Sequence, residues 1–241
     1  PIERCQLTGE EVKFELTKAP YREAVGCLMY LAVSTRPDIT FAVNYVSQFL
    51  EEPREQHWTM VKRIIKYLKG TAEMGIYYKE VDTQVNELES YSDADFASDP
   101  HTRRSVSGLV FKFCGGAIVW ASRKQKSVSL STTEAEYVAA SEAAKDIVWL
   151  NRLFGEIAPL EKVPTLRVDS ISAIKLARNP SFHKRSKHID VRAHFVRERV
   201  QNKEMNIVHV ASEDQVADIL TKPIPKIQFQ HLREKLGMFS M

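Results

Sequence analysis

Two hydrophobic runs flank a pair of glycines in SVSGLVFKFCGGAIVWASRK, residues 105–124. Because glycine accepts the positive φ angles of tight turns, Gly115 and Gly116 predict a β-hairpin here. Just before it, SYSDADFASD at 90–99 predicts a further strand that runs into a loop. The three segments together predict the antiparallel half of a sheet, and the rest of the chain is interpreted around this sheet.

Helices and strands alternate after the hairpin. A long helix is predicted over 131–155. It is followed by a strand at 164–169, a helix at 170–178, a basic helix at 188–201, a strand at 205–210 and a last short helix at 213–220. This order predicts an α/β fold with a mixed sheet and flanking helices, and not a purely doubly wound sheet.

The chain before the sheet has helical periodicity from Tyr21 to Gly70. Its hydrophobic residues predict three amphipathic helices, the second with Pro37 in its first turn. We therefore expect a linker at 1–20, a helical unit at 21–72, a connector at 73–88, a sheet domain at 89–222 and a tail helix at 223–241.

Composition limits the class of protein. With 44% hydrophobic residues, a chain of 241 residues can bury a substantial core. No apolar run approaches the about 20 residues of a membrane helix, so we expect no membrane span. Cys5, Cys27 and Cys114 lack C-x-x-C spacing and favour a reducing, intracellular setting, either cytoplasmic or nuclear. The chain begins at Pro1 without a leader, which fits a piece of a longer reading frame.

Positive charge is concentrated in two segments, although the net charge is only +3. Residues 100–127 hold six Lys or Arg and no acid, and residues 183–203 hold seven against two acids. Each segment is compatible with a solvated surface or with nucleic-acid binding, so charge alone does not decide between them.

Four acidic residues stand where such a sheet would bring them together: Asp93, Glu136, Asp169 and Asp218. Each also has an ordinary structural explanation. Asp93 could face solvent from its strand, and Glu136 could form a capping box with Thr133. Asp169 could cap the following helix, and Asp218 could lie on the surface of an amphipathic helix.

The four acids together indicate metal chemistry. Hydrolysis of a phosphodiester needs a basic water and stabilisation of charge on the leaving oxygen, and two divalent ions held by carboxylates supply both. Magnesium prefers hard oxygen ligands, so Asp and Glu are the residue types required. We therefore expect two Mg²⁺ ions, with Mn²⁺ as a possible substitute.

The order of these acids resembles the four-carboxylate set of the ribonuclease H fold. Longer motifs are similar to the C-terminal domain of copia-type long-terminal-repeat retrotransposon Pol polyproteins: SLSTTEAEYVAAS at 129–141, SKHIDVRAHFVRE at 186–198 and DQVADILTKP at 214–223. The segments at 21–43 and 57–71 resemble the end of reverse transcriptase in that group. The resemblance covers about Tyr21 to Met238.

The resemblance implies a ribonuclease H, an endonuclease that hydrolyses the RNA strand of an RNA–DNA hybrid during reverse transcription. Its metal ligands fall on Asp93, Glu136, Asp169 and Asp218, and Asp95 is a secondary candidate. By hypothesis, Asp93 and Asp218 hold one ion, while Asp93, Glu136 and Asp169 hold the other. By this resemblance the helical unit would be the thumb or connection of a reverse transcriptase. The chain has no Y-x-D-D motif, so we do not expect it to polymerise by itself.

The expected partners are an RNA–DNA hybrid and the remainder of the polyprotein. The basic residues that we expect to contact phosphates are Arg103, Arg104, Lys187, Arg192 and Arg197. A rival hypothesis is a domesticated or defective remnant that binds nucleic acid without cutting it. A third makes the helical unit a scaffold for dimerisation.

Overall fold

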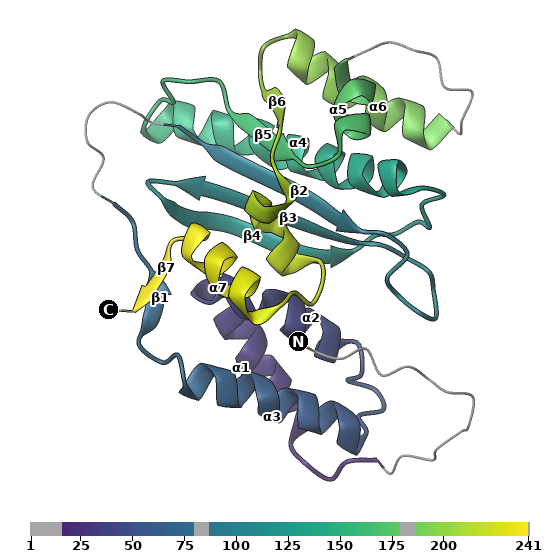
Figure 1. The fold of residues 1–241 in the computed structure, drawn as a ribbon, viewed down its shortest axis with the longest axis vertical. Helices are drawn as coiled ribbons and strands as arrows, with labels where there is room; N and C mark the ends of the chain where they lie inside the picture. Colours follow the sequence, from purple (N-terminus) through teal and green to yellow (C-terminus); the bar gives the residue numbers. More distant parts are fainter. Residues whose placement is uncertain (1–15, 80–86, 179–186, 241) are drawn as a thin grey trace.

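The structure is a computed structural model that describes residues 16–79, 87–178 and 187–240. The predicted linker at 1–20 therefore lies mostly outside the described residues. Figure 1 shows an elongated molecule in which a small helical unit lies below a larger unit built on a sheet.

A five-stranded sheet forms the centre of the larger unit, in the order β4-β3-β2-β5-β6. Its strands are β2 (Glu89–Asp95), β3 (Val106–Phe113), β4 (Gly116–Lys124), β5 (Thr165–Val168) and β6 (Asn206–His209). Strands β2, β3 and β4 are antiparallel, whereas β5 and β6 run parallel to β2. The predicted α/β fold with a mixed sheet is confirmed.

The predicted hairpin joins β3 to β4, with Phe113 opposite Gly116. Its turn places Cys114 at φ 51° and Gly115 at φ 81°, the left-handed values that the glycine pair predicted. This hairpin forms one edge of the sheet.

Helices cover both faces of the sheet (Figure 1). On one face lie α4 (Thr132–Ile157), α5 (Ile171–Arg178) and α6 (Lys187–Gln201), which share a hydrophobic core with the sheet. The other face is covered by the 3₁₀ helix η3 (Val216–Leu220) and by α7 (Lys226–Lys235), around a second core. The sheet is therefore buried between two layers.

The helical unit consists of α1 (Tyr21–Ser34), η1 (Pro37–Ile39), α2 (Thr40–Ser47) and α3 (Glu55–Lys69), as the periodicity predicted. Its core packs around Val25, Val46 and Val61, which have no exposed surface. Hydrogen bonds join it to the larger unit at several points. Trp120 Nε1 donates to the Ala32 carbonyl at 2.7 Å, and Arg233 donates to the Tyr67 hydroxyl at 3.0 Å. At β4, Lys124 donates to Gln48 at 2.7 Å and Asn44 donates to Ser122 at 3.3 Å.

Two features differ from expectation. The predicted helix at 213–220 is instead a pair of 3₁₀ turns, η2 (Ser212–Asp214) and η3. The extended backbone of Gln215 separates them, and its side chain accepts from the Ala217 N–H. In addition, β1 (Met74–Ile76) pairs with β7 (Met238–Ser240), which joins the connector to the tail.

Within the described ranges, every helix is too short or too polar to cross a membrane.

Candidate metal centre

Three carboxylates from separate parts of the chain meet beside the sheet. Asp93, Asp169 and Asp218 each offer an oxygen, and these oxygens all lie within 4.8 Å of one another. Asp93 lies in β2, Asp169 directly follows the neighbouring parallel strand β5, and Asp218 lies in η3. Parallel strands end at the same edge of a sheet, which explains how the first two come together.

Asp93 is the central and most buried member, with only 1% of its surface exposed. The Thr221 hydroxyl donates a hydrogen bond to its Oδ2. The solvent-facing alternative for Asp93 is therefore wrong.

Gly108, opposite Asp93 on β3, lets η3 lie directly on the sheet. A Cβ atom at Gly108 would lie 2.6 Å from Thr221 Cγ2 and 2.7 Å from the Ala217 carbonyl oxygen. Only glycine permits this approach. It places Asp218, which is 3% exposed, against the cluster, so the amphipathic-surface alternative for Asp218 is wrong too.

Glu136 joins the site from the first turns of α4. Its Oε1 accepts a hydrogen bond from the Ala94 N–H at 3.3 Å, and its buried Oε2 has no hydrogen-bond partner among the described residues. The alternative of a capping box between Thr133 and Glu136 is wrong: Ser131 caps the helix by accepting from the Glu134 N–H at 3.2 Å. Glu136 is thereby left for another role.

Asp169 does not cap α5 either. Ser170 accepts the hydrogen bond from the Ala173 N–H at 3.2 Å, which is the capping interaction. Asp169 instead accepts a long hydrogen bond, 3.5 Å, from the Ser212 hydroxyl of η2. All four acids thus lack the ordinary structural roles that the sequence left open.

Burial and repulsion between charges raise the pKa values of Glu136, Asp169 and Asp218. Burial, with the Asp93 and Asp169 charges, raises the pKa of Glu136 to about 10. Burial and Asp93 likewise raise the pKa of Asp218 to about 7, although Lys222 acts against the shift. The pKa of Asp169 is raised by burial and by Asp93. The cluster is therefore costly to ionise without positive charge nearby.

Lys222 supplies positive charge to the cluster. Its Nζ lies 2.9 Å from Asp218 Oδ1 and 3.7 Å from Asp93 Oδ2. Burial lowers the pKa of Lys222, but Asp93 and Asp218 outweigh it and the net shift is upward. One ammonium balances only part of four carboxylates, and an all-oxygen donor set with a buried unpartnered oxygen fits hard divalent cations.

Sequence reasoning missed Lys222, Thr221 and Gly108. The spacing of Asp218 and Lys222, four residues apart, was the available signal for an ion pair, although these residues were assigned to a helix end. No pattern within the strand identified Gly108, because its neighbours Thr221 and Ala217 are remote in sequence.

The expected phosphate-binding residues lie in two places. Arg103 and Arg104 are exposed on the loop that follows β2, and Arg103 has a φ of 54°. On α6, Arg192 lies 4.0 Å from Glu142, and Arg197 donates to the Leu176 carbonyl at 3.5 Å. Lys187 begins α6, but its side chain lies outside the described part of the structure.

A mixed sheet of this strand order, with buried carboxylates near the carboxyl ends of β2 and β5, defines a ribonuclease H-like fold. Solved structures with this likeness include the LC11 ribonuclease H1 isolated from compost, at 19% identity and a TM-score of 0.43, matching 56% of this chain and 93% of that one. Another is the foamy viral protease-reverse transcriptase in complex with an RNA/DNA hybrid, at 13% identity and a TM-score of 0.49, matching 85% of this chain and 26% of that one.

Sequence comparison gives the family. The chain is 45% identical over 236 residues to the retrovirus-related Pol polyprotein from transposon TNT 1-94 of Nicotiana tabacum, covering 98% of this chain and 18% of the polyprotein. It is 40% identical over 230 residues to that from transposon RE2 of Arabidopsis thaliana, covering 93% and 16%. The chain belongs to the retrovirus-related Pol polyproteins of transposons, and it spans less than a fifth of these relatives' length.

A third relative is of a different kind. The secreted RxLR effector protein 161 of Plasmopara viticola is 47% identical over 135 residues, which are 56% of this chain and 94% of that protein. No protein-family model matches the chain.

Proposed function

We propose that this chain is the ribonuclease H of a copia-type retrotransposon polyprotein and hydrolyses the RNA strand of RNA–DNA hybrids. The observation that carries the proposal is the meeting of Asp93, Asp169 and Asp218 within 4.8 Å, with Glu136 completing the buried acidic surroundings. The Pol polyprotein relatives support it, since reverse transcription produces such hybrids inside the cell.

Four carboxylates would hold the metal ions. Asp93 would be shared between two divalent ions, with Asp218 completing one site and Glu136 and Asp169 the other. Bound Mg²⁺ or Mn²⁺ would supply Lewis acidity and neutralise charge at the scissile phosphate. The oxygen-only donor set and the unpartnered Oε2 of Glu136 support this assignment.

The surrounding residues orient these carboxylates. Thr221 donates to Asp93, and the Ala94 N–H donates to Glu136, so each acid keeps a fixed rotamer. Lys222 keeps an ammonium beside Asp218, where it would also attract the phosphate of an incoming strand. These contacts prepare the geometry before substrate binds.

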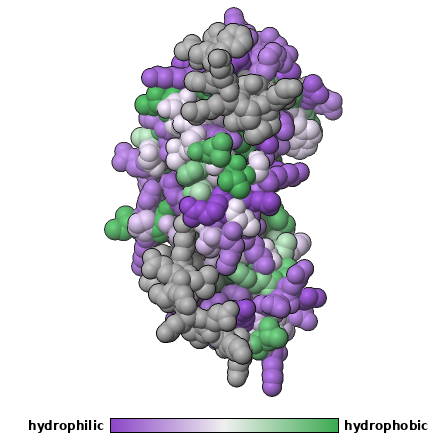
Figure 2. Space-filling view, turned by 90° about the vertical axis from the view of Figure 1, so that its right-hand side faces the viewer, coloured by the Kyte–Doolittle hydropathy of each residue, from purple (hydrophilic) through white to green (hydrophobic). Residues whose placement is uncertain are grey.

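The substrate would be held by basic side chains near the end of β2. Arg103 and Arg104 are exposed there, and we assign them to the phosphates of one strand, with Lys187, Arg192 and Arg197 of α6 as further contacts. Figure 2 shows the side of the molecule toward which β2 runs, where hydrophilic side chains surround small groups of hydrophobic ones. Recognition of 2′-hydroxyls across the minor groove would distinguish the RNA strand.

Cleavage of a labelled RNA–DNA hybrid tests the proposal, with duplex RNA and duplex DNA as controls and with and without Mg²⁺. We expect only the hybrid to be cut, and only with the ion. Asp93→Asn should lower the cleavage rate more than about 100-fold. Loss of a residue that only supports a metal ligand costs about 10- to 100-fold in activity, and loss of the ligand itself should cost more. Asp95→Asn, on the same strand but outside the three-carboxylate group, should retain cleavage.

A second function is a nucleic-acid-binding remnant that does not cut. The effector relative bears on it in one respect: a sequence similar to part of this chain makes up nearly the whole of a separate protein and not a segment of a polyprotein. A magnesium titration separates the two functions: hybrid binding without cleavage at any Mg²⁺ concentration would establish the remnant and refute the nuclease.

A further inference from the structure

Two hollows lie in the seam between the helical unit and the sheet unit. The larger, about 410 Å³, lies between α2 and α3 on one side and η3 and α7 on the other. Its apolar walls are formed by Ile39, Ala42, Met60, Ile64, Ile219 and Ile224. This volume is in the range of sites that hold a small organic group, about 300–1,000 Å³.

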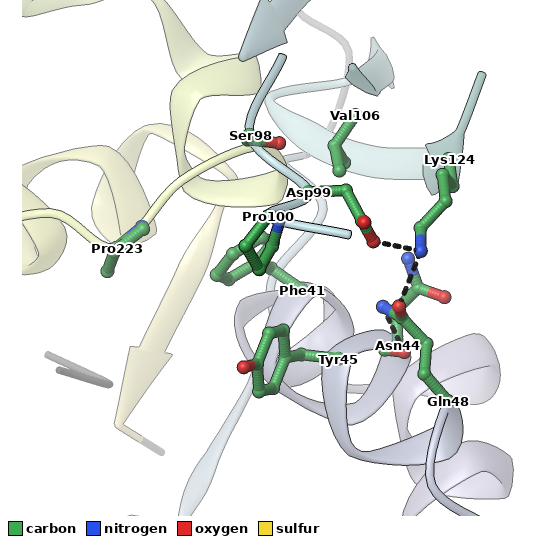
Figure 3. A pocket seen from close by; sticks show the side chains of 10 residues that line it. All are labelled: Phe41, Asn44, Tyr45, Gln48, Ser98, Asp99, Pro100, Val106, Lys124 and Pro223. Atoms are coloured by element: carbon green, nitrogen blue, oxygen red, sulfur yellow. Dashed lines mark hydrogen bonds and ion pairs between the residues drawn. The ribbon is translucent and has the colours of Figure 1, made fainter. Parts of the chain in front are cut away.

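The smaller hollow, about 40 Å³, adjoins the larger one, because Phe41 and Pro223 line both. Figure 3 shows Lys124 at its polar end, bonded to Asp99 and, at 2.7 Å, to Gln48. Its wall at 98–100 belongs to the loop that carries Arg103 and Arg104. The two hollows therefore line one path between that loop and α7.

Positive charge predominates along the larger hollow. Arg63 and Lys226 are exposed at its rim, and no ion pair or hydrogen bond of their side chains to other described residues is present. Its one acid, Asp38, is buried and already paired with Arg36 at 2.8 Å. The rim thus offers cations without competing anions, which suits a polyanion.

Aromatic rings line the same hollow. Phe41 and Phe229 are half-buried, and Phe229 rests edge-on against Tyr67 with ring centroids 5.8 Å apart. Aromatic faces between exposed cations are the combination by which proteins hold unpaired bases, because each ring stacks on a base while the cations contact the backbone.

One residue, Lys222, connects the hollow with the carboxylate cluster. Lys222 lines the hollow, while the Nζ of the same residue lies 2.9 Å from Asp218 Oδ1. Ile219, the next residue after Asp218, lines the hollow as well. The seam and the cluster are therefore neighbours on either side of Lys222.

We infer that this seam binds an unpaired nucleic-acid strand, the single-stranded extension of the hybrid whose paired part lies at the carboxylates. Bases of the extension stack on Phe41 and Phe229, and its phosphates contact Arg63 and Lys226. The inference rests on the proposed function for the location of the hybrid, but its contacts do not involve the metal ligands.

Binding measured without metal tests the inference. Fluorescence anisotropy of the full chain in EDTA compares a blunt labelled hybrid with hybrids that carry an unpaired tail of about ten nucleotides on either strand and at either end. We expect at least one tail to tighten binding by about tenfold, and the double variant Arg63→Gln, Lys226→Gln to lose most of this gain. If no tail tightens binding by the wild type, the seam does not hold a single strand and is left to another occupant, such as a peptide.

A charge-matched control separates the seam from general electrostatic attraction. Lys69→Gln with Lys175→Gln removes two exposed cations outside both hollows, and should keep the gain from the tail. Equal loss in the two double variants would overturn the inference. Thermal unfolding by circular dichroism checks that both variants remain folded.

Photocrosslinking gives a second readout. A tail containing 5-iodouracil should crosslink to peptides that contain Phe41 or Phe229, and crosslinks confined to other peptides would overturn the inference. Cleavage of a blunt hybrid by the wild type with Mg²⁺ tests the proposed function separately, because a blunt hybrid has no unpaired tail. The inference and the proposed function can therefore fail independently.

Discussion

Buried acids occur at two places in this molecule, and only those at one place have their charge balanced by the protein. In the helical unit, Asp38 accepts from Arg36 at 3.0 Å and 2.8 Å and from the Tyr67 hydroxyl at 2.6 Å. At the sheet, Asp93, Glu136 and Asp218 are equally buried but face one another, with Lys222 as their one ion-paired cation among the described residues. The first arrangement is satisfied within the protein, and the second is left for cations from solution.

Burial alone does not distinguish a structural acid from an acid of a functional site, but the charges around the acid do. A buried acid with a bidentate arginine serves structure, because its charge is fully compensated. Buried acids whose pKa values are raised by one another are held together by the surrounding packing against their own repulsion, which is the arrangement expected of a functional site. Changing one acid from each group should therefore have opposite effects on stability.

The largest effect is expected from Asp38→Ala. The substitution leaves the Arg36 guanidinium buried without its carboxylate, which should lower the free energy of unfolding by about 3–5 kcal/mol. Urea denaturation measures this value. A loss below about 1 kcal/mol would mean that Asp38 does not compensate Arg36.

The opposite sign is expected from Glu136→Gln in the absence of metal. The amide keeps the bond from the Ala94 N–H but has no proton to take up on folding, so the metal-free variant should be more stable than the wild type at pH 8. Urea denaturation in EDTA measures the gain. A loss of stability would show that the carboxylate is compensated within the protein after all.

The pH dependence of the metal-free wild type follows from the same shift. The pKa of Glu136 is raised from 4.5 to about 10, so the folded chain keeps a proton that the unfolded chain has released. Its contribution to stability is complete below pH 4.5 and is lost as the pH rises toward about 10. Glu136→Gln should flatten this decline between pH 6 and 9, and an unchanged slope would contradict the assignment.

How much of this could be predicted from sequence varies with the kind of interaction. Strand alternation and the Gly115-Gly116 pair were sufficient for the hairpin, because both signals are local. The pairing of β1 with β7 was missed, because residues 223–241 were expected to form a tail helix and a three-residue strand carries no pattern that identifies its partner. The 3₁₀ turns around Gln215 were predicted as one helix, because their apolar residues have helical spacing. That spacing does not reveal that the Gln215 side chain accepts the hydrogen bond of the Ala217 N–H and so interrupts the helix.

The candidate site shows the same limit. Capping motifs left Glu136 and Asp169 with two explanations each, and the structure assigns capping to Ser131 and Ser170 instead. Only the sheet brings Asp93, Asp169 and Asp218 together, because long-range neighbours are set by topology. The spacing of Asp218 and Lys222 offered a local signal for their ion pair, but the approach of Lys222 to Asp93 depends on how η3 packs on the sheet.

A smaller loss of stability is expected from Gly108→Ala. The added Cβ meets the Ala217 backbone at 2.7 Å, so η3 must shift, at a cost of about 1–3 kcal/mol. Hybrid cleavage should fall with it, since Asp218 moves with η3. Gly26→Ala is the matched control, because nothing lies within 4 Å of its Cβ, and it should not destabilise the protein. Equal effects of the two substitutions would contradict the role of Gly108.

The smallest effect is expected from Lys222→Gln. Without metal it should destabilise the protein by about 1 kcal/mol, because a partly exposed ammonium is screened by water. Saturating Mg²⁺ should narrow the difference, since divalent ions then compensate the carboxylates. Thermal unfolding of the wild type and of Lys222→Gln, in EDTA and in Mg²⁺, measures this difference. An identical loss of stability under both conditions would show that Lys222 does not balance the charge of the metal-binding carboxylates.

Electron paramagnetic resonance of bound Mn²⁺ tests most directly whether the buried acids of the sheet form a metal centre. The wild type should bind two Mn²⁺ ions per chain, Asp93→Asn should lose both, and Asp38→Asn should retain them if the protein remains folded. Binding that is unchanged by Asp93→Asn, or absent from the folded wild type, would contradict the account.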